Sequence, residues 1–233
     1  MGNGFVAWFS RSYKGIIVVL LAIMAAALVA LAMQHVSSSQ AASGRAPRPA
    51  PTFSSTATVE RFAVVGDSVT AANSPDIDNG QAGDASWAYY ANRDGARLVG
   101  GWALGGATTE AMNAAVKPYQ ADTLVILAGT NDSGQGVPFD TTAANLRSIV
   151  DKAGIDRVIV SSIPPRNAAP ATAAAYNTKL KQLSESAGWT FVDAAAALRE
   201  GDTYRDGFTA DGIHPTAEGA KALGGALHDA IVN

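Results

Sequence analysis

The segment RFAVVGDSVT, residues 61–70, places a short run of apolar residues directly before a Gly-Asp-Ser turn. From Arg61 onward, similar short apolar runs alternate with longer segments whose composition favours helices. This alternation is typical of β-α-β units, in which a helix connects two parallel strands. The sequence therefore predicts an α/β domain built on a parallel sheet.

Five strands and five helices are predicted in this domain. The strands cover residues 62–65, 97–99, 123–127, 157–161 and 190–192. The helices cover residues 87–92, 108–116, 142–153, 171–187 and 216–232. Because crossovers between parallel strands are right-handed, we expect helices on both faces of the sheet and a ligand crevice beyond the carboxyl ends of the strands. The expected fold is a three-layer α/β/α sandwich with a five-stranded parallel sheet.

An uncharged stretch, GIIVVLLAIMAAALVALAM at residues 15–33, precedes this domain. It is long enough to cross a bilayer as a helix of about 20 residues. Arg11 and Lys14 lie before it and favour retention of the N-terminus in the cytoplasm. We therefore predict a short cytoplasmic segment at 1–14 and a transmembrane anchor at 15–35, which would place the remaining chain outside the cytoplasm.

Small residues at 30–32 and at 40–43 keep cleavage and secretion open as an alternative to anchoring. Residues 36–60 are rich in Ser, Ala, Pro and Thr and contain almost no large apolar side chains. Such a composition is typical of a disordered linker. The predicted organisation is thus an anchor, a linker and one folded domain at 61–233.

Composition excludes several classes of function. The chain has no cysteine, so it has no disulfide framework, thiol nucleophile or cysteine metal site. From Arg61 onward it carries 13 basic and 19 acidic residues, and an acidic domain repels nucleic-acid backbones. Only two separated histidines follow the predicted anchor, which leaves no readable metal site. The glycines at 100–106 do not match a nucleotide-binding motif, so no cofactor is expected.

Four short motifs carry the chemistry, and each follows a predicted strand or precedes the last helix. They are Gly66-Asp67-Ser68, Gly105-Gly106, Gly129-Thr130-Asn131-Asp132 and Asp211-Gly212-Ile213-His214. A serine hydroxyl needs an imidazole to take its proton and a third group to hold that imidazole in one tautomer. Ser68, His214 and Asp211 can supply these three roles.

Acyl transfer also needs hydrogen bond donors for the oxyanion of the tetrahedral intermediate. The amides of Ser68 and Gly106 and the side chain of Asn131 are the predicted donors, with Gly105 as an alternative to Gly106. Two further acidic residues of these motifs are interpreted as turn and loop braces, namely Asp67 and Asp132.

The histidines narrow the choice of the base. His228 lies near the end of the last predicted helix, where a cation is favoured by the helix dipole, so a structural role is expected for it. His214 is left as the base. Asp211 precedes it by three residues and can reach the imidazole from the same loop, whereas Asp206 is a weaker candidate because it lies farther away in sequence.

Together the four motifs resemble the SGNH hydrolases, also called the GDSL-type esterases and lipases, over residues 61–233. The matching blocks are a GDS serine, a glycine, a G-x-N-D asparagine and a D-x-x-H pair. The resemblance implies the flavodoxin-like SGNH hydrolase fold. It also assigns catalysis and oxyanion stabilisation to Ser68, Gly106, Asn131, Asp211 and His214.

One departure from the family pattern is Val69, which stands where the family name implies leucine. The expected function is that of an extracytoplasmic serine esterase or lipase acting through an acyl-serine. The substrate is expected to be a small-molecule, lipid or acylated glycan ester. An acyltransferase of the cell envelope and a non-catalytic envelope-binding module are the alternatives, and the sequence leaves the oligomeric state open.

Substrate specificity is expected to come from the loop at 70–86. Aromatic residues near the motifs either line the cleft or pack the core. For Trp87, Tyr89 and Tyr90 the sequence leaves both roles open, whereas Trp102, beside Gly106, is expected in the cleft.

Overall fold

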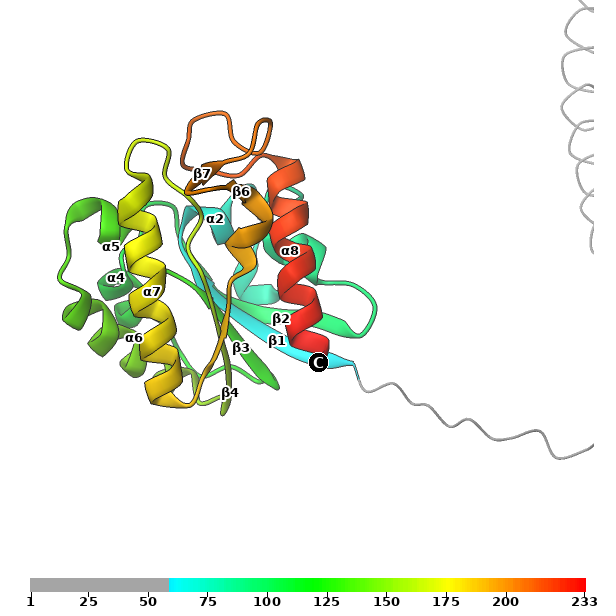
Figure 1. Ribbon diagram of the computed structural model, residues 1–233. Coiled ribbons are helices and arrows are strands. Elements are labelled where there is room, and N and C mark those ends of the chain that lie inside the picture. Colours follow the sequence, from blue (N-terminus) through cyan, green and yellow to red (C-terminus); the bar gives the residue numbers. More distant parts are fainter. Residues whose placement is uncertain (1–58) are drawn as a thin grey trace, which may run out of the picture. The chain divides into compact units, whose positions relative to one another are not determined.

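The central sheet has five parallel strands in the order β2-β1-β3-β4-β5 (Figure 1), as seen in a computed structural model that describes residues 59–233. The strands are β1 (Glu60–Gly66), β2 (Ala96–Ala103), β3 (Thr123–Leu127), β4 (Arg157–Ser161) and β5 (Thr190–Val192). This confirms the predicted sheet. It also extends the second strand to Ala103, so that only Leu104 separates the strand from the glycine motif.

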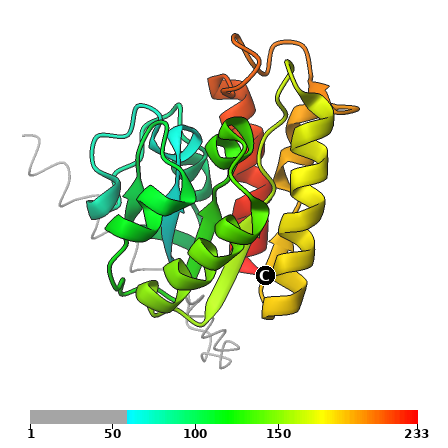
Figure 2. The same ribbon diagram turned by 90° about the vertical axis from the view of Figure 1, so that its left-hand side faces the viewer.

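Helices cover both faces of the sheet and give three layers. On one face lie α4 (Thr109–Ala115), α6 (Phe139–Ala153) and α7 (Pro170–Ala187). On the other face lie α3 (Trp87–Ala91) and α8 (Ala217–Val232). In Figure 2 the green and yellow helices of the first face lie in front of the sheet, and the red α8 lies behind it.

Strand β1 shows how the sequence produces this sandwich. Phe62 and Val64 pack in the core beneath α3 and α8, whereas Ala63 and Val65 pack in the core beneath α4, α6 and α7. Successive side chains of a strand point to opposite faces, so a strand covered on both sides must be apolar at every position. All four side chains are fully buried, which explains the continuous apolar run that begins the domain.

Several short elements were not predicted. They are α2 (Ser68–Ala71), the 3-10 helix η1 (Ile77–Asn79), α5 (Thr130–Gln135), the 3-10 helix η2 (Ala194–Leu198) and the two-stranded β6 (Arg199–Glu200) and β7 (Thr203–Tyr204). Elements of one or two turns are too short to show a helical or alternating pattern. Two of them, α2 and α5, begin inside the predicted catalytic motifs.

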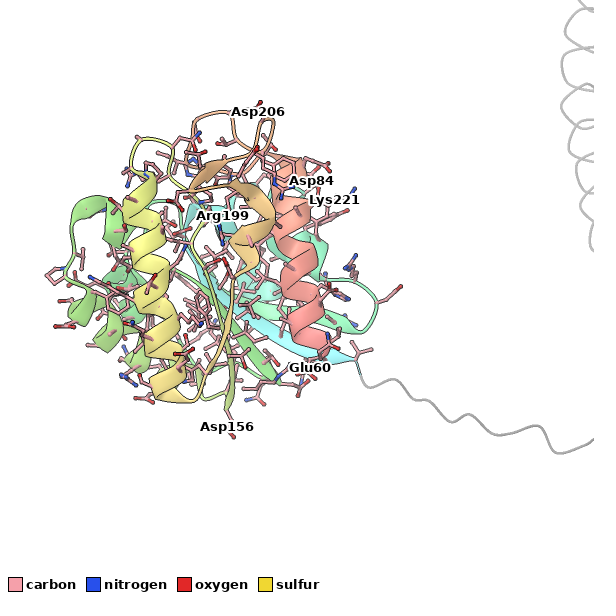
Figure 3. All side chains as sticks on the ribbon, viewed as in Figure 1. Glu60, Asp84, Asp156, Arg199, Asp206 and Lys221 are labelled. Carbon is pink, nitrogen blue, oxygen red and sulfur yellow. The ribbon has the colours of Figure 1, made fainter. Side chains whose placement is uncertain are left out.

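The loops that carry the four motifs meet at one end of the domain. Glu60 and Asp156, at the amino ends of β1 and β4, lie at the lower end in Figure 3, and Asp206, in the loop before α8, lies at the upper end. Parallel strands bring all their carboxyl ends to one edge of the sheet, which is where such folds bind ligands.

The predicted anchor at 15–35 and the predicted linker, except for its last two residues, lie outside the described residues. Among the described residues, 59–233, none of the helices has the length and apolar character needed to cross a bilayer.

Candidate active site

Ser68 is the first residue of α2 and directly follows the turn that ends β1. The side chain of Asp67 caps this short helix, because its Oδ1 accepts a hydrogen bond of 3.0 Å from the Val69 amide. A Cβ at Gly66 would lie 2.1 Å from the Thr70 hydroxyl oxygen. The strand can therefore turn into the helix at this point only because residue 66 has no side chain. The turn leaves Ser68 half-buried at the carboxyl edge of the sheet.

The loop before α8 brings an imidazole to this serine. His214 Nε2 lies 2.9 Å from Ser68 Oγ, and His214 Nδ1 lies 2.7 Å from Asp211 Oδ2. Asp211 Oδ1 also accepts hydrogen bonds from the amides of Ile213 at 2.9 Å and His214 at 2.8 Å. One carboxylate thus fixes both the backbone of the loop and the orientation of the ring, across 146 residues of sequence from Ser68.

Asp211 is held in its ionised form. The hydrogen bond from the His214 ring, followed by that from the His214 amide, lowers the pKa of this carboxyl well below its usual value of 3.8. An ionised carboxylate only accepts hydrogen bonds, so it favours the tautomer with the proton on Nδ1. His214 Nε2 then presents a lone pair to the Ser68 hydroxyl, which is the arrangement that a general base requires.

The two predicted oxyanion elements lie side by side. Gly106 adopts a left-handed conformation, φ +77°, in the turn between β2 and α4. Asn131 lies in the first turn of α5, and its Nδ2 donates a 2.9 Å hydrogen bond to the carbonyl of Ala107, the residue after Gly106. This bond fixes the Asn131 side chain against the glycine turn. The Gly106 amide and Asn131 Nδ2 remain the predicted donors, and Gly105 lines the pocket that also contains Ser68.

The Asp132 carboxylate connects the segments that carry the two oxyanion elements. This buried carboxylate accepts hydrogen bonds from the Thr109 amide at 3.0 Å, from the Thr109 hydroxyl at 2.5 Å and from the Thr142 hydroxyl at 3.2 Å. Thr109 begins α4, and Asp132 lies in the first turn of α5. A structural brace was predicted for Asp132. That it connects these two helices could not be read from the sequence, because Thr109 lies 23 residues before Asp132.

Asp67 occupies an unusual position directly before the nucleophile. Its side chain is completely buried, and its Oδ2 has no hydrogen bond partner among the described residues. Burial raises the pKa of this carboxyl from 3.8 to about 6, against the opposing effects of the Val69 amide, the Thr130 side chain and the nearby His214. A buried carboxyl favours its neutral form because the charged form loses its solvation.

Other candidate residues play structural roles or lie apart. Asp206 is exposed on the loop at the upper end of Figure 3, and the ring of His214 pairs with Asp211 instead. His228 is buried, and its Nδ1 bonds to the carbonyl of Ala91 at 3.0 Å. This supports the structural role expected for His228, and it adds a partner that the sequence did not show, because the imidazole ties α8 to α3.

The aromatic residues separate into core and surface. Trp87 is fully buried, and its indole donates a 2.9 Å hydrogen bond to the Thr70 hydroxyl, whereas Tyr89 is half exposed. Trp102 packs, partly buried, against the core beneath α4 and does not line the pocket at Ser68. The expectation that Trp102 lines this cleft was therefore wrong. Within residues 59–233, no group of three metal-ligating side chains is positioned to hold a metal ion.

Comparison with known structures supports the fold. A catalytic mutant of an acetylxylan esterase from Geobacillus stearothermophilus aligns with a TM-score of 0.60 and 22% identity over 75% of this chain and 94% of that chain. A GDSL-like lipase from Bacteroides thetaiotaomicron VPI-5482 aligns with a TM-score of 0.55 and 20% identity over 74% and 87%, respectively. At this identity the likeness concerns the fold alone.

None of the curated proteins matches the sequence. The model of the GDSL-like lipase/acylhydrolase family, in contrast, matches residues 64–222, a range that contains all four motifs. The chain therefore belongs to the GDSL-like lipase/acylhydrolase family.

Proposed function

We propose that this enzyme is an extracytoplasmic serine esterase that cleaves carboxylic esters through an acyl-serine intermediate. The observation that carries the proposal is the continuous hydrogen-bonded series Ser68-His214-Asp211, with distances of 2.9 and 2.7 Å. Nucleophile, base and orienting acid are already within hydrogen bond reach, which is the geometric requirement for this chemistry.

In the first half-reaction, His214 takes the proton of Ser68 as the serine oxygen attacks the ester carbonyl. The negative charge that develops on the carbonyl oxygen is stabilised by the amides of Ser68 and Gly106 and by Asn131 Nδ2. Preorganised donors of this kind contribute strongly because they need not reorient during the reaction. His214 then gives its proton to the departing alcohol, and the acyl group remains on Ser68.

In the second half-reaction, His214 takes a proton from water, and the resulting hydroxyl attacks the acyl-serine. The same donors stabilise the second tetrahedral intermediate, and the proton returns to Ser68 as the acid leaves. Asp211 remains ionised throughout and stabilises the imidazolium that forms in both halves. The atoms balance as one ester and one water to one acid and one alcohol.

The extracytoplasmic location is supported by the sequence of the N-terminus. The uncharged run at 15–33 and the preceding cations Arg11 and Lys14 favour an anchor with the enzyme on the far side of the membrane. Substrates within reach would then be lipid esters, acylated glycans or small esters from the surroundings. The acetylxylan esterase with a similar fold acts on an acylated glycan, which makes glycan esters one class to test.

The test compares the full-length chain with Ser68→Ala in detergent. Hydrolysis of p-nitrophenyl esters and labelling by a fluorophosphonate probe are measured for both proteins. Ser148→Ala on α6, a serine outside the site, serves as the matched control. We expect turnover and labelling to be lost in Ser68→Ala and kept in the control. Ester turnover that persists in a folded Ser68→Ala protein would refute the assignment of the nucleophile.

A further inference from the structure

A pocket opens directly beside the nucleophile and is lined mainly by small apolar residues, whereas the catalytic residues are polar. It has a volume of about 310 Å³ and is lined by nine residues. These are Ser68, Val69, Ala71, Ala72, Asn73, Ala85, Gly105, His214 and Pro215. Because Ser68 and His214 form part of its wall, this pocket is placed to hold the part of the substrate directly next to the scissile ester bond.

The lining indicates what kind of group fits. Among residues 59–233, no Asp, Glu, Lys or Arg side chain lines the pocket, so a charged group would find no partner there. Asn73 is the main polar side chain of the wall apart from the catalytic pair. Its Nδ2 donates to Asp84 at 2.7 Å, and its Oδ1 accepts from the Ala85 amide at 2.9 Å. A sugar ring, which needs several hydrogen bond partners, is therefore poorly matched to this pocket.

The size of the pocket limits the group further. A cavity of about 150 Å³ accommodates benzene, so about 310 Å³ corresponds to roughly a dozen non-hydrogen atoms. Three alanines and a glycine occupy positions where larger side chains would fill this space, namely Ala71, Ala72, Ala85 and Gly105. The pocket is thus this large because the residues of its walls have small side chains or none.

The wall is held in one shape by the loop that follows α2. The hydrogen bonds of Asn73 to Asp84 and Ala85 close this loop on itself, and the Gly83 amide adds a 3.1 Å bond to the Ser74 hydroxyl. Asp84 lies at the same end of the domain as the catalytic loop (Figure 3). Ala72 is the only described non-glycine residue with positive φ, at +35°. Backbone held in such a conformation indicates that the surrounding contacts determine it.

We infer that this pocket is a specificity pocket for a compact, uncharged, largely apolar group next to the scissile ester bond, and that Ala85 limits the size of that group. The inference rests on the proposed esterase function and narrows its substrate. Esters with a short alkyl or aryl group fit the pocket. A sugar or a long lipid tail of the same ester must lie outside it.

The experiment enlarges and reduces the pocket at Ala85 in the full-length chain. The Ala85 amide donates to Asn73 through the backbone, so changes of its side chain leave that bond available. Ala85→Leu fills part of the space and Ala85→Gly widens it. Ala114→Leu, at an exposed position of α4, is the matched control for adding the same side chain elsewhere.

Two substrate series identify which side of the ester enters the pocket. The first varies the acyl group from acetyl to decanoyl with p-nitrophenol constant, and the second varies the alcohol from methyl to decyl with acetate constant. In one series, we expect Ala85→Leu to lower kcat/KM at least tenfold for groups longer than about four carbons and less than threefold for the shortest. Ala85→Gly is expected to shift the preference in that series toward longer groups, while the control keeps the wild-type profile.

Equal effects on all esters of both series, or unchanged profiles in both folded variants, would overturn the pocket assignment while leaving the esterase intact. If Ala85→Leu does not fold, the test rests on Ala85→Gly. A shift of its substrate preference toward longer groups supports the pocket assignment, and no shift or a shift toward shorter groups overturns it. Failure of the proposed function looks different, because the wild-type protein would then hydrolyse no ester of either series and Ser68 would resist the fluorophosphonate probe. That result would overturn the pocket assignment as well.

Discussion

Replacing Asp67 with asparagine is expected to stabilise the protein at neutral pH. Asparagine keeps the oxygen that accepts the Val69 amide, so the cap of α2 is retained, and it removes a charge that is completely buried. The pKa of Asp67 rises from 3.8 to about 6 on folding. A rise of about two pH units, at 1.4 kcal/mol each, corresponds to about 3 kcal/mol.

The free energy of unfolding depends on pH because Asp67 binds its proton more tightly in the folded state than in the unfolded state. Because the pKa of Asp67 is higher in the folded state, the unfolded chain ionises first as the pH rises from 3.8. The folded wild-type protein therefore loses stability between pH 3.8 and about 6, and it carries the full cost above that range. The asparagine variant has no such titration, so its advantage must grow across the same window.

The assay is urea-induced unfolding followed by tryptophan fluorescence at several pH values between 4 and 8. Only the difference between wild type and Asp67→Asn is interpreted, because other titrating groups, including Asp211, contribute equally to both. Asp206→Asn, at an exposed position, controls for the loss of one surface carboxylate. A difference in the free energy of unfolding that stays constant within about 0.5 kcal/mol over this range would refute the reasoning.

Three further substitutions test the site and its supports. Asp211→Asn should lower kcat by about 10³- to 10⁴-fold with little change in KM, because the imidazole loses its preferred tautomer. The measurement is steady-state ester hydrolysis, and a decrease in kcat of less than about tenfold would contradict the role of Asp211. Asp132→Ala leaves three buried donor groups without their acceptor and should lower the free energy of unfolding by about 3–5 kcal/mol, measured by urea unfolding; a loss below about 1 kcal/mol would show that the brace is dispensable. Gly129→Ala forces a Cβ to within 2.4 Å of Tyr176 at φ +117° and should cost more than about 2 kcal/mol in thermal unfolding, whereas Gly136→Ala, at φ +71° in open space, should cost only about 1 kcal/mol; equal costs would argue against the clash.

The sequence alone determined the sheet and the residues of the catalytic series. Strands buried on both faces are continuous apolar runs, and the central strands β1, β3 and β4 could be recognised for that reason. The edge strands β2 and β5 are less buried, and their short apolar runs could be recognised because they alternate with helical segments. Ser68, Asp211 and His214 could be proposed because acyl transfer permits few residue types and the chain offers few histidines. The structure brings these three side chains within hydrogen bond distance.

The tertiary structure alone decided how the site is supported and what shape it has. The bond from Asn131 to Ala107, the link from Asp132 to α4 and the burial of His228 against α3 all join segments distant in sequence. Local patterns report which face of an element is apolar, but they carry no information about which distant polar group lies opposite. The pocket beside Ser68 has the same origin, since its volume depends on how separate loops converge and on the space that their small residues leave between them.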